Sequence, residues 1–241
     1  MSFPRGGLNA EAGAGALKTA QLEHWRSDFG RAYTDRNSLA PGALDALYVK
    51  NYGVGRGELN QRFLAHIPRS ARILEVGCNE GNQLCALREM GFDQLYGIEI
   101  QDYALRKARA RVRNAHLALA SAFEIPYPDG FFDLVFTSGV LIHIAPADLP
   151  KALREIHRCS RKFIWGFEYY SPQPMEVPYR GHQSLLWKAD FAGLYLDLFD
   201  DLDLVRVERL PYLENANVDA MFLLSRKPDA SAPAGQDQGR T

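Results

Sequence analysis

The chain has few cysteines, no long apolar run and no excess of charge of either sign. Its three cysteines, Cys78, Cys85 and Cys159, form neither a paired framework nor a metal-ligand spacing, so we expect a reducing cytoplasm and no metal site. No apolar segment approaches the length of a membrane span, so no membrane partner is expected. Lysines and arginines number 28 against 29 aspartates and glutamates, a net charge of −1, and the absence of a long basic run disfavours nucleic acid as a partner.

Two terminal segments contain too little apolar surface to form a core. Residues 1–16 are rich in glycine and alanine and lack the charged start and apolar centre of a signal peptide, so we expect a flexible N-terminus. Residues 228–241 contain no large apolar residue and are expected to be a disordered tail. The chain is 46% hydrophobic, and residues 17–227 are the right length for one α/β domain.

Helical and strand patterns follow one another along residues 17–227. Apolar residues recur at helical spacing over 20–29 and 44–66, which predicts a helical cap over residues 17–70. From residue 71 onward, short β-rich runs alternate with helical segments in a core that ends at residue 227. The expected strands are residues 73–76, 95–99, 115–119, 134–138, 163–169, 204–210 and 221–225. Because such alternation favours parallel pairing, we predict a Rossmann-like, seven-stranded, mostly parallel sheet with helices on both faces.

A glycine-rich turn after the first strand is the most informative motif. Residues 72–82 read Arg-Ile-Leu-Glu-Val-Gly-Cys-Asn-Glu-Gly-Asn, with Gly77, Asn79 and Gly81 in the turn that opens a helix. Turn glycines let a ligand approach the backbone closely, and a helix N-terminus offers unpaired N–H groups. The motif therefore predicts a nucleotide-type pocket at the carboxyl ends of the strands.

Two carboxylates narrow the choice of nucleotide. Glu99 ends the second strand, twenty-four residues after Glu75, where it can accept hydrogen bonds from both ribose hydroxyls. Glu75 would repel the pyrophosphate of NAD, and Asn82 stands where a dinucleotide-binding turn favours a small residue. The pattern resembles the class I S-adenosylmethionine-dependent methyltransferases, whose donor is a sulfonium that carries a ribose and an amino acid end. The alternatives are a non-catalytic adenosine-binding module, an NAD enzyme, and a corner whose glycines serve only its geometry.

The resemblance implies further contacts with the donor and an antiparallel pair at the end of the sheet. In this family, residues after the third strand face the adenine, although Phe123 could equally be a core residue. The corner after the fourth strand meets the methionine part of the donor, and the cap reaches over its carboxylate. The implied donor-binding residues are Glu75, Gly77, Asn79, Gly81, Glu99, Ile100, Ser121, Ala122, Phe123, Ser138, Gly139, Tyr33 and Arg36.

Three further segments, residues 25–38, residues 168–172 and residues 177–182 with 188–193, carry a narrower resemblance. They resemble the methylases associated with pseudaminic acid biosynthesis, and the match runs from about residue 25 to residue 224. This resemblance implies a small-molecule acceptor in a biosynthetic pathway, with a homodimer left open. Within the cap, Asn37 is a candidate for substrate contact, whereas Trp25 and Phe29 are expected to dock the cap as core residues.

The end of the fifth strand and the loop over residues 171–190 supply the acceptor-side candidates. The strand should deliver Glu168, Tyr169 and Tyr170 beside the methyl group, and a carboxylate between phenols suits a protonated amine or a guanidinium. The alternative for Glu168 is a salt bridge to Arg180 or Arg36. The loop residues Tyr179, Arg180 and His182 are further substrate-binding candidates, with Arg180 able to bind a carboxylate and ordinary loop anchoring as the alternative.

The predicted reaction is methyl transfer to a polar small molecule. We favour nitrogen methylation, at an amino or guanidino group of an amino acid or amino sugar, because of Glu168. Oxygen methylation of a sugar or small acid is the alternative, and it would use His143 or His182 as a base. A structural role is the alternative for His143. The catalytic candidates are Glu168, His143, Tyr170 and His182.

Overall fold

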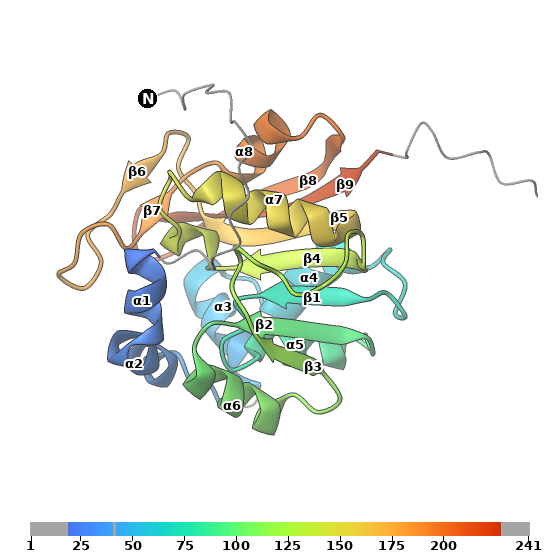
Figure 1. The fold of residues 1–241 in the computed structure, drawn as a ribbon, viewed down its shortest axis with the longest axis horizontal. Helices are drawn as coiled ribbons and strands as arrows, with labels where there is room; N and C mark the ends of the chain where they lie inside the picture. The colour runs from blue at the N-terminus through green and yellow to red at the C-terminus, as the bar shows by residue number, and fades with distance from the viewer. Residues whose placement is uncertain (1–18, 41, 228–241) are drawn as a thin grey trace, which may run out of the picture.

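The computed structural model describes residues 19–40 and 42–227. They form a seven-stranded sheet with helices on both faces and a separate two-stranded sheet (Figure 1). The expectations for residues 1–16 and 228–241 concern segments outside the described residues.

The elements follow the expected alternation after residue 71. The helices are α1 (Ala20–Arg26), α2 (Asp28–Arg36), α3 (Ala43–Tyr52), α4 (Arg56–Leu64), α5 (Asn82–Glu89), α6 (Asp102–Arg111), α7 (Leu149–Cys159), α8 (Phe191–Leu198) and the 3₁₀ turn η1 (Leu141–His143). The strands are β1 (Ile73–Val76), β2 (Leu95–Glu99), β3 (His116–Leu119), β4 (Phe132–Ser138), β5 (Ser160–Tyr169), β6 (Met175–Glu176), β7 (Trp187–Lys188), β8 (Leu202–Pro211) and β9 (Val218–Arg226).

The large sheet has the strand order β3-β2-β1-β4-β5-β9-β8. The first five strands in this order are parallel, and β9 is antiparallel to both β5 and β8. The predicted fold class and the antiparallel final pair are confirmed. The strand order reverses at β1, which lies between β2 and β4. A crevice is therefore expected at the carboxyl ends of these strands. The α1–α2 pair lies beyond those ends, at the left of Figure 1.

Alternate strand residues contribute to two cores on opposite faces of the sheet. Leu74 and Val135 belong to the core that contains residues of α7 and α8. Ile73, Leu134 and Trp165 belong to the core that contains residues of α3, α4 and α5. This division follows from the period of two in a strand, which points successive side chains to opposite faces. The segment over residues 17–70 is therefore not all cap, because α4 is part of the core layer.

The structure splits both helical segments that the sequence predicted as continuous. In the first, the side chain of Ser27 accepts a hydrogen bond from the backbone N–H of Phe29 and starts α2 as a new helix. In the second, Gly53 ends α3 in a left-handed conformation at φ 74°, and α4 begins after Gly55. Helical periodicity continued across both breaks, so the apolar pattern did not reveal them.

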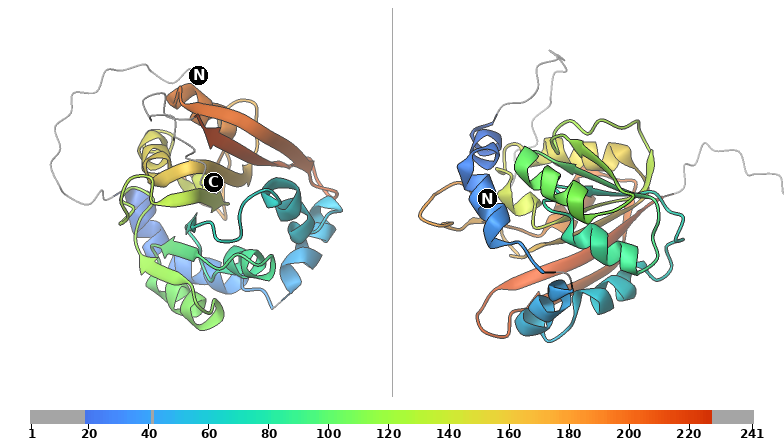
Figure 2. Two further views of the ribbon diagram at one scale, coloured as in Figure 1. Left: turned by 90° about the vertical axis from the view of Figure 1, so that its right-hand side faces the viewer. Right: turned by 90° about the horizontal axis from the view of Figure 1, so that it is seen from below.

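The acceptor-side loop and the last strands also differ from prediction. The loop over residues 171–190 contains the pair β6–β7, which was not predicted because each strand has only two residues. Strands β8 and β9 extend beyond the apolar runs that predicted them, since their antiparallel backbone pairing includes exposed polar residues. Figure 2 shows this hairpin, in orange and red, along one edge of the sheet.

Gly166 of β5 provides a test of the side-chain packing between the neighbouring strands β5 and β9. A Cβ atom at this position would lie 2.2 Å from Cζ of Phe222, whose ring is buried. We expect Gly166→Ala to lower the free energy of unfolding by about 1–3 kcal/mol, because an overpacked core must shift side chains or backbone. Urea unfolding measures the change.

Gly57→Ala in α4 is the matched control. A Cβ atom there makes an ordinary contact with the carboxylate of Asp45 at 3.4 Å. Alanine favours the helix over glycine, so this variant should be as stable as the wild type or more so. Equal stability of both variants would contradict the packing described for Phe222.

Candidate functional site

A cavity of about 440 Å³ opens at the carboxyl ends of β1, β2 and β4. Most of the predicted donor-site residues line it, and most of the predicted acceptor-site residues do not. The predicted residues in its lining are Tyr33, Arg36, Asn37, Glu75, Gly77, Asn79, Glu99, Ile100, Ser121, Ala122, Phe123, Ser138, Gly139 and His143. The predicted residues outside its lining are Gly81, Glu168, Tyr169, Tyr170, Tyr179, Arg180 and His182.

The turn between β1 and α5 has three residues with positive φ: Gly77 at 74°, Asn79 at 47° and Gly81 at 81°. Asn tolerates this region better than other residues with a Cβ, so it can replace the middle glycine of the motif. A Cβ on Gly77 would lie 2.6 Å from Val140, and one on Gly81 would lie 2.3 Å from Val112. Gly81 therefore serves the turn and its packing, and it lies outside the lining of the cavity.

Glu99 is buried, and both of its carboxylate oxygens accept backbone hydrogen bonds. Oε2 accepts from the N–H of Asn79 at 2.8 Å, and Oε1 accepts from Ile100 at 2.8 Å and from Gln101 at 2.9 Å. Burial raises the pKa of Glu99, and these three hydrogen bonds oppose the increase. The carboxylate is thus held in one position at the end of β2, with its remaining lone pairs available to the cavity.

Glu75 is also buried but is less well satisfied. Among the described residues, its Oε2 atom has no hydrogen-bond partner. Burial raises its pKa well above the ordinary value, and the positive charge of Arg56 opposes this effect. A buried carboxylate without a partner is costly, so this position in the cavity suits a cationic or hydrogen-bond-donating ligand group.

The residues after β2 and β3 line the part of the cavity beyond Glu99. Ser121 accepts a hydrogen bond from the N–H of Phe123 at 3.2 Å, which fixes the turn after β3. Phe123 lines the cavity and also belongs to the apolar core, so both interpretations of this residue hold. Gln101, which was not predicted, donates to the carbonyls of Trp25, Arg26 and Ser27 at 3.1–3.2 Å and joins α1 to the β2–α6 turn.

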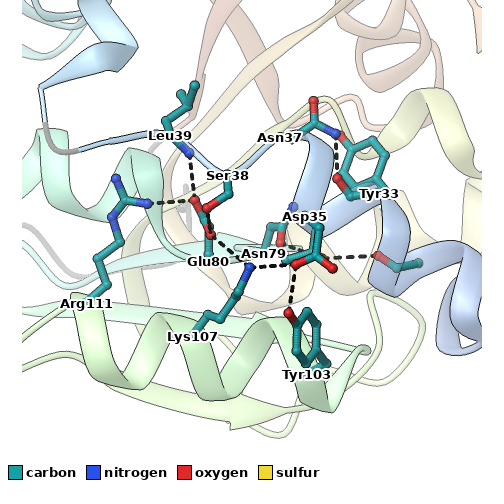
Figure 3. A network of polar contacts seen from close by, with 12 residues as sticks. Tyr33, Asp35, Asn37, Ser38, Leu39, Asn79, Glu80, Tyr103, Lys107 and Arg111 are labelled. Carbon is teal, nitrogen blue, oxygen red and sulfur yellow. Dashed lines mark hydrogen bonds and ion pairs between the residues drawn. The ribbon is translucent and has the colours of Figure 1, made fainter.

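Polar contacts attach α2 and the following residues to the glycine-rich turn (Figure 3). Thr34 donates to the side chain of Asn79 at 3.0 Å. The buried carboxylate of Glu80 accepts from the Ser38 hydroxyl at 2.9 Å, from the Leu39 N–H at 3.1 Å and from Arg111 at 2.6 Å. The cap is therefore bonded directly to the turn that would hold a nucleotide.

Three cap residues predicted at the site, Tyr33, Arg36 and Asn37, line the cavity. Burial is the main cause that raises the pKa of Tyr33, so its phenol stays protonated at neutral pH. Trp25 also lines the cavity, and its ring lies 4.4 Å from that of His143. The expectation that Trp25 only docks the cap is corrected, because α1 lies across the opening with this side chain at the cavity.

His143 lies at the cavity as a neutral imidazole. Its Nδ1 atom lies 2.8 Å from the carbonyl oxygen of Leu185, and because a carbonyl only accepts, Nδ1 carries the proton. The lone pair is therefore on Nε2. Burial lowers the pKa of His143 to about 4, so it is neutral at pH 7 but only a weak base.

Glu168 does not face the cavity as predicted. It is 1% exposed, and its carboxylate accepts from the N–H groups of Val140 at 3.1 Å and Ile142 at 3.4 Å. The carboxylate therefore holds the η1 turn at the end of β4. Among the described residues, Glu168 forms a salt bridge with neither Arg180 nor Arg36, so the alternative prediction is not supported either.

The other acceptor-side candidates lie beyond the cavity because β5 continues as a paired strand. Tyr170 donates its N–H to the carbonyl of Val218 at 2.8 Å, which keeps the strand end in the sheet, and the Arg209 guanidinium lies over its ring. Tyr179 is half-buried, whereas Arg180 and His182 are exposed. The predicted contacts of these residues with the acceptor are not supported by their positions.

Sequence reasoning also missed Tyr48 and Arg56. Tyr48 of α3 lines the cavity, and Arg56 of α4 is buried directly behind it, with Nη1 donating to the Tyr48 hydroxyl at 2.6 Å. Tyr48 lies within the apolar helical pattern of residues 44–66, which predicted a helix of the cap and gave no sign of a residue at the cavity. No local signal distinguishes a buried arginine from a solvated one at the start of a helix.

Within residues 19–40 and 42–227, every helix is too short or too polar to serve as a membrane span. In the same residues, no group of three or more His, Cys, Asp or Glu side chains is arranged to hold a metal ion.

Comparison with known proteins agrees with this geometry. Residues 74–162 match the family model described as a methyltransferase domain. An uncharacterized methyltransferase of Schizosaccharomyces pombe is 28% identical over 110 residues, which cover 41% of this chain and 39% of that protein. Malonyl-(acyl-carrier protein) O-methyltransferase of Serratia marcescens is 29% identical over 124 residues, which cover 52% of this chain and 46% of that protein. The chain thus spans less than half the length of these curated relatives.

A solved structure extends the comparison to the whole fold. The crystal structure of Burkholderia thailandensis 1,6-didemethyltoxoflavin-N1-methyltransferase, with bound 1,6-didemethyltoxoflavin and S-adenosylhomocysteine, is similar with a TM-score of 0.65 at 17% identity. The match covers 89% of this chain and 94% of that chain. The chain therefore shares the fold of that methyltransferase, and its residues 74–162 match a methyltransferase-domain family.

The burial of Glu168 predicts a specific pH dependence of stability. Burial raises the pKa of its carboxyl from 4.5 to about 7 in the folded protein. The folded state therefore binds this proton more tightly than the unfolded state, and the stabilisation is lost as pH rises from about 4.5 to 7. Glu168→Gln should reduce the fall in unfolding free energy between pH 5 and pH 8 by up to about 3 kcal/mol.

Urea unfolding at pH 5, 6, 7 and 8 measures this dependence. Glu124→Gln, at an exposed carboxyl, should leave the pH dependence as it is in the wild type. A Glu168→Gln variant with the wild-type pH dependence would show that this carboxyl is not the buried titrating group described above.

Proposed function

We propose that this protein transfers a methyl group from S-adenosylmethionine to a polar small molecule. The observation that carries the proposal is the pair of buried carboxylates, Glu75 and Glu99, at the carboxyl ends of β1 and β2 beside the glycine-rich turn. One carboxylate suits the ribose hydroxyls and the other suits the ammonium group of the donor. The methyltransferase domain matched by residues 74–162 supports the same donor.

Different residues around the cavity suit different parts of the donor, from the adenine at one end to the methionine part at the other. The turn after β3, with Ser121, Ala122 and Phe123, offers an apolar wall and a polar edge to the adenine. The corner at Ser138 and Gly139, after β4, would hold the methionine part and the methyl carbon. His143, Trp25 and Tyr33 surround the adjoining space, where an acceptor would exclude water.

The reaction is an in-line displacement at the methyl carbon. A lone pair of the acceptor forms the new bond to carbon while the carbon–sulfur bond breaks and its electron pair stays on sulfur, giving S-adenosylhomocysteine. The protein contributes mainly orientation, which can lower a barrier by roughly 7 to 11 kcal/mol in favourable cases. The Nε2 atom of His143 is available for a proton released by the acceptor.

We favour a nitrogen acceptor, such as an amino or guanidino group of an amino acid or amino sugar. Glu168 does not support a nitrogen acceptor, because its carboxylate accepts hydrogen bonds from the backbone. The support comes from His143, which is only a weak base at the cavity. An alcohol must lose its proton as it attacks, and the imidazole of His143, with a pKa near 4, is poorly suited to take it. A nitrogen that binds in its neutral form already has a free lone pair, which a protonated amine or a guanidinium gains only after it has lost a proton.

Oxygen methylation of a small acid is the second candidate. A carboxylate is ionised at neutral pH and also needs no base, and Arg36 at the cavity offers a cation to bind one. The Serratia marcescens relative is named as an O-methyltransferase. We place either reaction in a small-molecule biosynthetic pathway of the kind implied by the pseudaminic acid resemblance. We also propose that the protein is cytoplasmic, and a homodimer is the assembly to test. A non-catalytic adenosine-binding module is the rival from another class.

Titration calorimetry and a transfer assay test this proposal. S-adenosylmethionine and S-adenosylhomocysteine should bind and NAD should not. Transfer from labelled donor to panels of amines, guanidino compounds, carboxylic acids and sugars, with the methyl located by NMR, identifies the acceptor atom. Binding without transfer to any panel member would favour the non-catalytic module, and binding of NAD alone would refute the donor.

Glu99→Gln should weaken the binding of S-adenosylhomocysteine by about 1.5–3 kcal/mol, because the ribose hydroxyls lose a charged acceptor. Calorimetry measures the affinity, and circular dichroism checks the fold. Glu89→Gln, at an exposed carboxyl of α5, is the control and should bind as the wild type does. Unchanged affinity in a folded Glu99→Gln protein would remove this residue from the ribose site.

A further inference from the structure

Arg56 is a fully buried cation behind the wall of the cavity. It is 0% exposed, and its guanidinium lies 5.0 Å from the ring centre of Trp165 and 4.9 Å from that of Phe167. Its Nε atom donates to the side chain of Asn60 at 2.7 Å, while Nη2 has no partner among the described residues. No salt bridge of Arg56 is formed within residues 19–40 and 42–227. Burying a cation without a directly paired carboxylate is costly, so its position calls for an explanation.

The contacts of Arg56 orient two hydroxyl groups at the cavity wall. Its Nη1 atom donates to Tyr48 Oη at 2.6 Å and, at a longer distance of 3.4 Å, to Ser138 Oγ. Both residues line the cavity, Tyr48 from α3 and Ser138 from the end of β4. A guanidinium only donates, so each hydroxyl accepts from Arg56 and keeps its own proton to donate elsewhere.

A hydroxyl that accepts from a cation is a stronger donor to an anion, because the hydrogen bonds polarise one another. The two hydroxyls therefore form a site for negative charge. Glu75, at the same cavity, has an unpartnered Oε2 atom that suits positive charge, and the charge of Arg56 acts on its carboxylate. An acidic and a basic recognition group thus lie on one cavity wall, which is the arrangement that a zwitterion needs.

We propose that the hydroxyls of Tyr48 and Ser138, held by Arg56, form a subsite for a carboxylate group in this cavity. Arg56 is its positioning residue, since it contacts the hydroxyls and does not itself line the cavity. The inference rests on the proposed function and names a recognition element within the same site. The carboxylate has two sources, the amino acid end of the donor or the acceptor, and both present the same chemistry to the subsite.

Three probes separate the carboxylate from the rest of the donor in titration calorimetry. They are S-adenosylhomocysteine, its analogue that lacks the carboxylate but keeps the ammonium group, and 5′-methylthioadenosine. The variants are Tyr48→Phe, Ser138→Ala and Arg56→Lys. Tyr52→Phe is the matched control, because Tyr52 lies one turn further along α3 and its hydroxyl donates to Asp219 instead of facing the cavity.

If the subsite binds the donor carboxylate, Tyr48→Phe and Arg56→Lys weaken S-adenosylhomocysteine roughly 10- to 100-fold, as for a lost hydrogen bond to a charged group. The other two probes change by less than about threefold, and Ser138→Ala has a smaller effect of the same selectivity. Tyr52→Phe binds all three as the wild type does. This selectivity distinguishes recognition from a structural role, which would weaken every probe alike.

If the subsite binds an acceptor carboxylate, S-adenosylhomocysteine is unaffected by the variants. Propionate then binds to the wild-type protein loaded with S-adenosylhomocysteine, as saturation-transfer NMR detects, and Tyr48→Phe abolishes that binding. Equal losses for all three nucleoside probes would overturn the proposal. The proposal would also be overturned if Arg36→Gln were the one variant that selectively weakened S-adenosylhomocysteine binding. It would be overturned as well if the Tyr48, Ser138 and Arg56 variants bound both S-adenosylhomocysteine and propionate as the wild type does.

The wild-type protein distinguishes failure of the subsite from failure of the proposed function. Binding of S-adenosylhomocysteine and 5′-methylthioadenosine by the wild type, without selectivity in the variants, refutes the subsite alone. A wild-type protein that binds neither compound refutes the donor site itself. Thermal melting of Tyr48→Phe, which keeps the aromatic ring, verifies that the variant is folded.

Discussion

The burial of two carboxyl groups at the carboxyl ends of β1 and β2 is the constraint on which the site depends. Glu75 and Glu99 are both nearly inaccessible to solvent, and burial raises the pKa of each. Glu99 is stabilised by three backbone N–H groups of the adjoining turns, whereas Glu75 faces the charge of Arg56 at longer range. The turn geometry, the buried arginine and the cap all serve to hold charge in a place that the solvent does not reach.

The cap and the nucleotide-type turn form one connected structure. Thr34 contacts Asn79 directly, and Glu80 joins the segment after α2 to Arg111 of α6. A ligand that orders the turn would therefore also order the cap over the cavity. Asn79 suits the middle of the turn because its side-chain oxygen lies 3.0 Å from the hydroxyl of Thr34, a contact with the cap that a glycine could not make.

The cavity is lined by residues of the cap and α3 and not by the end of the fifth strand. The carboxylate of Glu168 is engaged by the backbone of η1, and β5 continues in register with β9, so the strand end does not present its side chains to the cavity. The space beside Ser138 and Gly139 is instead surrounded by Trp25, Tyr33 and Tyr48.

The sequence by itself determined the fold class, the glycine-rich turn and the donor-side residues, because these depend on local periodicity and on residues within one strand–turn–helix unit. Glu75, Glu99 and the residues after β3 line the cavity as their positions in the motif indicated. Only the tertiary structure decided the surroundings of Glu168, the contact of Trp25 with the cavity and the burial of Arg56. These properties depend on which segments, far apart in the chain, come into contact, and on which polar groups then have no partner. The residue pattern of a single segment predicts neither.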